Sequence, residues 1–286
     1  MGPKIILGTA NFHNTYGLSK KKIADISELK KIINIANKNN IDEVDTAFSY
    51  GVERKLKYLS NKKWKINTKI PTLNLNKDIK NNIFSMVKNS LKYLKKKNFE
   101  SIFLHDPSQI HNKKGEEILK SLIELKKFGY TKKIGFAVYN PEELKKLIKS
   151  FRPDLVQVPL SIADRRFKDN GLLNNLKKLK IKVQARSIFL QGLLTLKANN
   201  RPQYFNLWKN TFSEWDRYIL VNKYDRIKVC LDFISSIKEI DKFIVGFNTS
   251  IELNEIINNL KKKKIKKFFR FKNLNSKILI PLNWKI

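Results

Sequence analysis

A regular alternation of two kinds of segment most constrains the fold of this chain. Short apolar runs, typical of buried strands, alternate with longer amphipathic stretches, typical of helices. The strand candidates are Lys4–Gly8, Ile41–Asp45, Lys65–Lys69, Ser101–His105, Lys133–Phe136, Leu155–Pro159, Lys182–Arg186 and Phe243–Val245. The helix candidates are Glu28–Asn39, Gly51–Leu59, Lys77–Lys95, Gly115–Phe128, Pro141–Lys149, Leu172–Leu179, Asp225–Ile237 and Ser250–Lys263. Ser27 is expected to cap the first helix, Asn140 to open the fifth and Gly129 to close the fourth.

Eight strand–helix pairs within 286 residues predict an α/β protein with a closed (β/α)8 barrel, the TIM-barrel fold. A G-x-G-x-x-G turn does not follow the first strand candidate, which disfavours an open dinucleotide-binding sheet. The chain also lacks a linker rich in Gly, Pro or Ser. We therefore predict a single domain over residues 1–286, with a barrel core at about 4–263 and a C-terminal tail, 264–286, packed on the barrel.

One segment, Lys197–Tyr224, does not fit the alternation of strands and helices, because it is long for a connection between a strand and a helix. It carries the aromatic residues Tyr204, Phe205, Trp208, Phe212, Trp215 and Tyr218. Two interpretations are open. The segment is either a functional loop at the barrel mouth or a short extra helix packed on the barrel rim.

The formal net charge of +34 raises the hypothesis of a nucleic-acid-binding protein. However, Lys is spread along the whole chain together with abundant Asn and Ile, and these three residues share A/T-rich codons. Genome composition is therefore a sufficient cause, and we expect solvated Lys side chains rather than a specific nucleic-acid site. A general attraction for anionic ligands remains an expectation. No stretch of eighteen apolar residues is present, so we expect no membrane partner.

The single cysteine, Cys230, cannot form an intramolecular disulfide, which suits a reducing cytoplasm, the location that we expect. No second His or Cys completes a metal cluster, so we expect no metal. Of the isolated histidines, we interpret His111 as a surface residue and His13 as a residue of a pocket wall.

The candidate site begins at residues 45–51, D-T-A-F-S-Y-G, directly after a strand candidate. Side chains at the carboxyl ends of barrel strands face the active site, so Asp45, Lys69 and His105 should converge, with Tyr50 just beyond. An ammonium group lowers the pKa of a nearby phenol, and a buried ammonium needs an anionic partner such as Asp45. A neutral imidazole could orient a substrate oxygen. This set suits proton transfer to a carbonyl oxygen; the alternative is an Asp that caps the next turn with a Tyr packed on it.

These residues carry a resemblance. From Leu7-Gly8-Thr9-Ala10 to about Leu260, the chain resembles the aldo/keto reductases, barrel enzymes that move hydride between NADP(H) and a carbonyl or alcohol. The Asp, Tyr, Lys and His of that family fall, in the expected order, on the catalytic candidates Asp45, Tyr50, Lys69 and His105. The resemblance implies that the tyrosine is the general acid for reduction, tuned by the lysine and aspartate, and that the histidine orients the carbonyl. The implied partner is a small-molecule carbonyl compound: an aldehyde, a ketone or a sugar derivative.

The resemblance also implies a nicotinamide cofactor. Gln157 matches the glutamine that holds the nicotinamide carboxamide, whereas the Ser and Asn of the family's Gly-x-Ser-Asn segment are missing from residues 135–138. Residues 186–194 resemble a bacterial branch, in which Ser187 and the backbone beyond it meet the pyrophosphate. Residues 246–250 resemble the loop for the adenosine phosphate, where helix-start amides suit a phosphate. The cofactor-binding candidates are Gln157, Arg186, Ser187, Phe189, Gly192, Gly246, Asn248 and Ser250.

NADP(H) is the cofactor that the resemblance implies, but the Arg or Lys that commonly grips the ribose 2′-phosphate is not evident, so NAD(H) remains an alternative. Arg186 replaces the aromatic residue that usually stacks on the nicotinamide. Its flat guanidinium could stack on that ring, pair with the pyrophosphate, or form a structural ion pair with a rim carboxylate.

Two other classes of function are weighed against a reductase. A barrel that binds or senses a nicotinamide cofactor without turnover is supported by the missing Ser and Asn, but it has no need of Tyr50 with Lys69. A charge-driven nucleic-acid binder is disfavoured by the even spread of Lys. We expect a monomer or a weak homo-oligomer.

Overall fold

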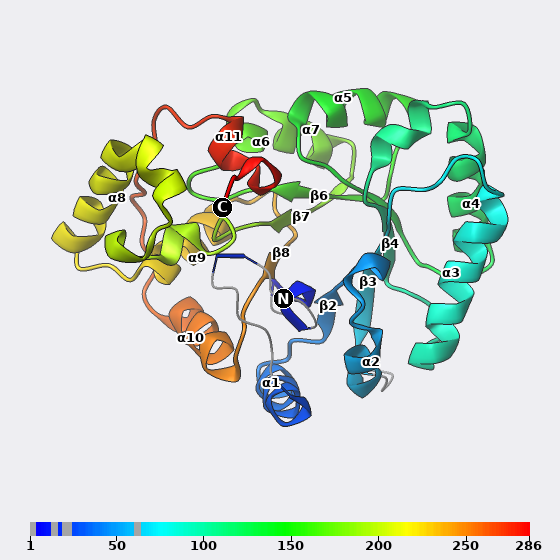
Figure 1. Cartoon of the computed structure of the whole chain (residues 1–286), viewed down its shortest axis with the longest axis horizontal. Coiled ribbons are helices and arrows are strands. Elements are labelled where there is room, and N and C mark those ends of the chain that lie inside the picture. Colours follow the sequence, from blue (N-terminus) through cyan, green and yellow to red (C-terminus); the bar gives the residue numbers. More distant parts are fainter. Residues whose placement is uncertain (1–3, 13–16, 19–24, 60–63) are drawn as a thin grey trace.

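A closed barrel of eight parallel strands forms the centre of the molecule, and helices surround it (Figure 1). The computed structural model describes residues 4–12, 17–18, 25–59 and 64–286. The strands are β1 (Ile5–Gly8), β2 (Glu43–Asp45), β3 (Lys65–Ile70), β4 (Ser101–Leu104), β5 (Ile134–Ala137), β6 (Leu155–Pro159), β7 (Lys182–Arg186) and β8 (Lys242–Val245). Each pairs in parallel with the next, and β8 pairs with β1 to close the barrel. The (β/α)8 prediction is confirmed.

Each predicted helix corresponds to an observed one. These are α1 (Ile26–Lys38), α2 (Glu53–Leu56), α3 (Ile79–Leu94), α4 (Gly115–Lys127), α5 (Pro141–Ser150), α7 (Leu172–Lys178), α9 (Arg226–Ser236) and α10 (Ser250–Lys261). Asn140 caps α5 and Gly129 follows α4 in the left-handed region, as expected. The cap of α1 was wrongly predicted. Asp25, not Ser27, accepts a hydrogen bond from the Glu28 amide, because the chain is still extended at Asp25 and Ser27 already belongs to the helix.

The hydrophobic core has two parts on opposite sides of the barrel wall. The larger part lies between the strands and the surrounding helices, and it includes Leu7, Val44 and Val156. The smaller part, Phe103, Ala137 and Leu155, lies apart from it inside the barrel. Because strand side chains alternate between the two faces, residues two apart share the interior, and here many of them are polar.

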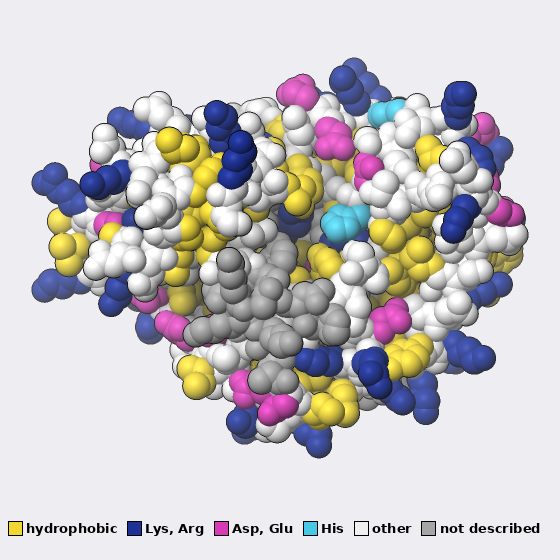
Figure 2. Space-filling view, viewed as in Figure 1, with side chains coloured by type: hydrophobic (Ala, Val, Ile, Leu, Met, Phe, Trp, Pro, Cys, Tyr) yellow, Lys and Arg dark blue, Asp and Glu magenta, His cyan; other side chains and the backbone are white. Residues whose placement is uncertain are grey.

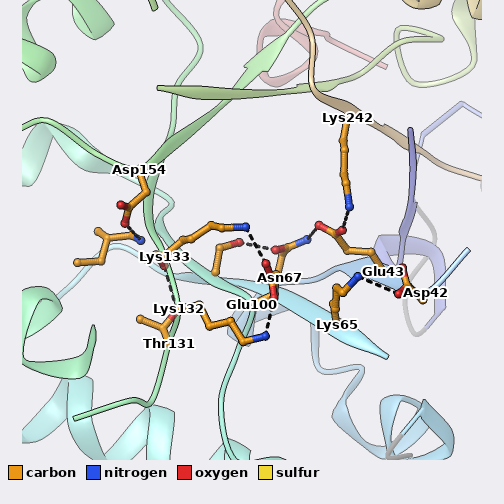
Figure 3. Close-up of polar contacts among 12 residues, drawn as sticks. Asp42, Glu43, Lys65, Asn67, Glu100, Thr131, Lys132, Lys133, Asp154 and Lys242 are labelled. Carbon is orange, nitrogen blue, oxygen red and sulfur yellow. Dashed lines mark hydrogen bonds and ion pairs between the residues drawn. The ribbon is translucent and has the colours of Figure 1, made fainter. Parts of the chain in front are cut away.

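Polar contacts close the amino-terminal end of the barrel (Figure 3). Glu43 of β2 is 2% exposed, pairs with Lys242 of β8, and accepts a 2.8 Å hydrogen bond from Asn67 of β3. Ser101 of β4 donates in turn to Asn67. Outside this group, Lys133 binds Glu100 at 2.7 Å. The contacts of Glu43, Asn67, Ser101 and Lys242 thus join the strands β2, β3, β4 and β8 at this end of the barrel.

The segment Lys197–Tyr224 ends in a helix, α8 (Lys209–Val221), that lies beside the barrel next to the C-terminal tail (Figure 1). Its Trp215 is fully buried, and its ring lies 5.7 Å from that of Phe269 and 5.4 Å from that of Phe271. The structure therefore supports the interpretation of an extra helix on the rim. Two short helices complete the fold, α6 (Arg166–Asp169) and α11 (Ser276–Leu279).

Two further observations concern surface charge and hydropathy. Figure 2 shows Lys and Arg side chains spread around the visible face rather than gathered in one patch. In the described part of the chain, no helix has both the length and the apolar character needed to cross a membrane.

Candidate active site

A cavity of about 420 Å³ opens at the carboxyl ends of the strands. Strand ends and the residues just after them supply much of its lining, as expected for a barrel. The predicted site residues that line it are Asp45, Tyr50, Lys69, His105, Arg186, Ser187, Phe189, Gly192, Gly246 and Asn248. Gln157 and Ser250 do not line it. His13 lies outside the described residues, and His111 is exposed, as expected, with its Nε2 3.1 Å from Ser150 Oγ.

Asp45 and Lys69 form a buried ion pair at the ends of the neighbouring strands β2 and β3. The Lys69 ammonium lies 2.5 Å from Asp45 Oδ2 and also donates to the Thr46 carbonyl at 2.9 Å. The Lys69 side chain is only 3% exposed and the Asp45 side chain 8%. Because both groups are buried away from water, each charge needs the other as its partner, and the ion pair therefore fixes the position of the ammonium group.

Tyr50 lies beside this pair, on a short turn that follows β2. The Lys69 Nζ is 5.6 Å from the centroid of the Tyr50 ring. Burial, and after it the negative charge of Asp45, raise the pKa of the Tyr50 phenol, while the charge of Arg186 opposes this. The expected lowering of the pKa by Lys69 is therefore not found. Because the ammonium is bound to Asp45, burial outweighs its charge, and the phenol keeps its proton.

His105 follows directly after β4 and faces the same cavity. Burial lowers its pKa to about 4, and the positive charges of Lys69 and Arg186 act in the same direction. The imidazole is therefore neutral near pH 7 and can donate one hydrogen bond to a ligand oxygen.

Gln157 on β6 lies beneath the cavity, in contact with Asp45. Its amide nitrogen donates to Asp45 Oδ1 at 2.5 Å and to Gln184 Oε1 at 3.0 Å, and the side chain is fully buried. Its amide oxygen has no hydrogen-bond partner among the described residues. Gln184 was missed in the sequence analysis. Strand alternation could have found it, because it lies two residues before Arg186 on the same strand.

Arg186 lies at the end of β7, and its guanidinium carbon is 4.0 Å from the centroid of the Tyr139 ring. Its Nη2 donates to the Val138 carbonyl at 3.1 Å, and its buried Nε has no partner among the described residues. No ion pair between described residues involves Arg186, so the interpretation of a structural ion pair is not supported. Tyr139 also lines the cavity, and the sequence analysis did not identify it.

The chain after β7 forms a tight turn along the cavity wall. Ser187, Leu190, Gln191 and Gly192 all have left-handed backbone conformations, with φ of 59°, 47°, 50° and 94°. Such conformations cost energy at residues other than glycine and cluster at ligand sites. Opposite this turn, the Leu18 amide donates to the Gln191 carbonyl at 3.0 Å.

The start of α10 forms the far end of the cavity. Glu252 Oε2 accepts hydrogen bonds from the amide of Asn248, at 2.7 Å, and from its side chain, at 3.1 Å. The amide of Ser250 donates to Glu28 Oε1, at 2.5 Å. The backbone of the predicted phosphate loop is thus already bonded to two carboxylates, which the sequence analysis did not identify.

These features define the class of (β/α)8-barrel proteins with a polar site at the carboxyl ends of the strands. The family model described as the aldo/keto reductase family matches residues 4–274. The chain belongs to the aldo/keto reductase family, an oxidoreductase family, which confirms the resemblance.

Solved structures of similar fold include aldo-keto reductase AKR11C1 from Bacillus halodurans. Its holo form has a TM-score of 0.70 at 16% identity, with 92% of this chain and 88% of that chain covered. Its apo form has a TM-score of 0.71 at 16% identity, with 92% and 87% covered. PA4992 from Pseudomonas aeruginosa, a candidate aldo-keto reductase, has a TM-score of 0.66 at 16% identity, with 90% and 88% covered. At such identities the likeness concerns the fold alone. No curated protein sequence matches this chain.

Proposed function

We propose that this protein uses a nicotinamide cofactor to reduce the carbonyl group of a small molecule, an aldehyde, a ketone or a sugar derivative, to an alcohol. The observation that carries the proposal is the set of four side chains around one cavity. Asp45 and Lys69 form a buried pair, the Tyr50 ring lies beside that ammonium, and His105 faces the same space.

In this proposal Tyr50 donates its phenolic proton to the carbonyl oxygen. Its raised pKa keeps the phenol protonated until the transfer, so it acts as an acid rather than as a resident phenolate. As the proton leaves, negative charge develops beside the Lys69 ammonium, which Asp45 holds in place. Solvent then returns a proton to the phenolate.

His105 has a separate task. Its neutral imidazole donates a hydrogen bond to the same carbonyl oxygen and orients it toward Tyr50. The nicotinamide, when bound, supplies the hydride that the carbonyl carbon accepts.

The residues of the cavity fit a nicotinamide dinucleotide. Gln157 does not line the cavity, so its unpartnered amide oxygen would accept a hydrogen bond from a carboxamide only after its side chain turned toward that space. Ser187, Gln191 and Gly192 of the left-handed turn line the cavity, and this turn would follow a pyrophosphate. The start of α10 would receive the adenosine end.

The experiment is to mix the purified chain with reduced cofactor and a panel of aldehydes, ketones and sugar derivatives, and to follow cofactor oxidation by absorbance. We expect oxidation that depends on one class of carbonyl compound, and its loss in Tyr50→Phe. Cofactor binding without oxidation by any member of a broad panel would instead support a barrel that only binds or senses the cofactor.

A further inference from the structure

We propose that this protein binds NAD(H) in preference to NADP(H), because carboxylates occupy the end of the cavity that a ribose 2′-phosphate would approach. The inference rests on the proposed function, since it concerns the cofactor of the same site. It goes further by choosing between two cofactors that differ only in one phosphate group.

The first observation is that carboxylates already hold the helix-start amides. Glu252 Oε2 accepts from the Asn248 amide at 2.7 Å, and Glu28 Oε1 accepts from the Ser250 amide at 2.5 Å. The hydrogen bond from Ser250 also lowers the pKa of Glu28, so this carboxylate is ionised near neutral pH. Of these residues, Asn248 and Glu252 line the cavity, whereas Ser250 and Glu28 do not, so a phosphate in the cavity would compete with Glu252 for the Asn248 amide.

The second observation is the distribution of charge along the cavity. Among the described residues that line it, the only Lys and Arg are Lys69 and Arg186, and both lie at the end that carries Tyr50 and His105. At the α10 end the charged lining residues are Glu252 and Glu255. Lys31 lies 3.4 Å from Glu28, but it is an exposed residue of α1 and does not line the cavity.

These charges discriminate between the two cofactors. A phosphate monoester carries about −1.5 to −2 charges at pH 7, and like charges brought together at a binding site cost affinity. The 2′-hydroxyl of NAD(H) is instead a donor that a carboxylate such as Glu252 can accept from. The overall charge of +34 attracts anions in general and would favour the more negative NADP(H). The preference for NAD(H) therefore depends on the local carboxylates.

The test is to titrate the purified full chain with NADH and with NADPH, following the quenching of its tryptophan fluorescence. 5′-AMP and 2′,5′-ADP, compared by calorimetry, isolate the adenosine end of the cavity. We expect NADH to bind tighter than NADPH by about tenfold or more, the ratio that 1.4 kcal/mol produces. 5′-AMP should bind tighter than 2′,5′-ADP.

Two variants locate the cause. Glu252→Gln removes the charge but keeps an amide oxygen that can still accept from Asn248, so NADPH affinity should rise relative to NADH affinity. Glu116→Gln makes the same change of charge at a side chain of α4 that is 80% exposed, and it should leave the ratio unchanged.

Three outcomes would overturn the inference. If the unmodified chain binds NADPH as tightly as NADH or tighter, the inferred preference for NAD(H) is wrong, but the proposed reductase activity is unaffected. If Glu252→Gln leaves the ratio of NADH to NADPH affinity unchanged, the charge of Glu252 does not cause the preference, and the inference is again wrong while the proposed function is unaffected. Binding of neither cofactor would overturn the proposed function together with the inference.

Discussion

The amide nitrogen of Gln157 lies 2.5 Å from one oxygen of Asp45, and the other oxygen of that carboxylate lies 2.5 Å from the Lys69 ammonium. A buried amide and a buried ammonium thus fix both oxygens of one side chain. Since Lys69 lies beside the Tyr50 ring, Gln157 reaches the proposed acid through two intermediates. Gln157 is therefore a positioning residue, whatever else its free oxygen binds.

Gln157→Leu removes this donor and should lower the free energy of unfolding by about 1–3 kcal/mol, because Asp45 loses a buried hydrogen bond. Turnover should fall as well, and the pH profile of kcat should shift, since the charge of Asp45 bears on Tyr50. Urea denaturation and steady-state kinetics measure both effects. Gln184→Leu is the matched control: it leaves the bond from Gln157 to Asp45 in place and should affect kcat less. Equal kcat values in the two variants would argue against positioning through Asp45.

Lys69→Met should destabilise the fold by about 3–5 kcal/mol, because it leaves the buried Asp45 carboxylate without its partner. The control lies on the same strand. Lys65 pairs with Asp42 at 2.9 Å, but both side chains are partly exposed, so Lys65→Met should cost about 0–1 kcal/mol. Chemical denaturation of the two variants gives the comparison. Similar losses of stability would show that the buried Lys69–Asp45 pair contributes no more than the partly exposed Lys65–Asp42 pair.

The lowered pKa of His105 predicts a dependence of stability on pH. Between pH 6.5 and about 4 the unfolded chain binds a proton on this residue that the folded chain does not, so His105 destabilises the fold as the pH falls through that window. Unfolding midpoints measured across it should decline less steeply in His105→Asn than in the unmodified protein. His111→Asn, which removes an exposed imidazole, serves as the control. Parallel profiles in His105→Asn and the unmodified protein would contradict the buried neutral imidazole.

Arg186→Tyr should raise the affinity for the oxidised cofactor relative to the reduced one. Tyr139 and the Val138 carbonyl hold the guanidinium at the end of β7, where its charge acts on both Tyr50 and His105. That position is near the proposed reacting end, so the cation should disfavour a positively charged nicotinamide. Titration with both redox forms measures the ratio. A parallel fall in both affinities would indicate contact with the pyrophosphate instead.

The barrel could be predicted from the sequence because its strands are buried on both faces and read as short apolar runs. The predicted bounds of Leu155–Pro159 and Lys182–Arg186 match β6 and β7, whereas Ser101–His105 exceeds β4 by one residue. The positions of Asp45, Lys69 and His105 followed from the rule for strand ends.

Contacts between distant segments could not be predicted in the same way. The bond from Ser250 to Glu28 joins residues 222 apart, and nothing local in either segment indicates it. The direction in which Gln157 points, toward Asp45 rather than into the cavity, depends likewise on how the barrel closes. The contact of Arg186 with Tyr139 joins the end of β7 to the connection after β5, and it could be found only once the order of the strands around the barrel was known.

The central claim is that Tyr50 gives its proton to a carbonyl oxygen, and the direct measurement is the single-turnover rate of Tyr50→Phe with bound reduced cofactor. The phenyl ring preserves the packing beside Lys69 and removes only the hydroxyl. We expect the rate of cofactor oxidation to fall by roughly 10²–10⁴, the usual worth of a positioned general acid, while cofactor affinity is unchanged. A rate equal to that of the unmodified protein would contradict the assignment of Tyr50 as the acid.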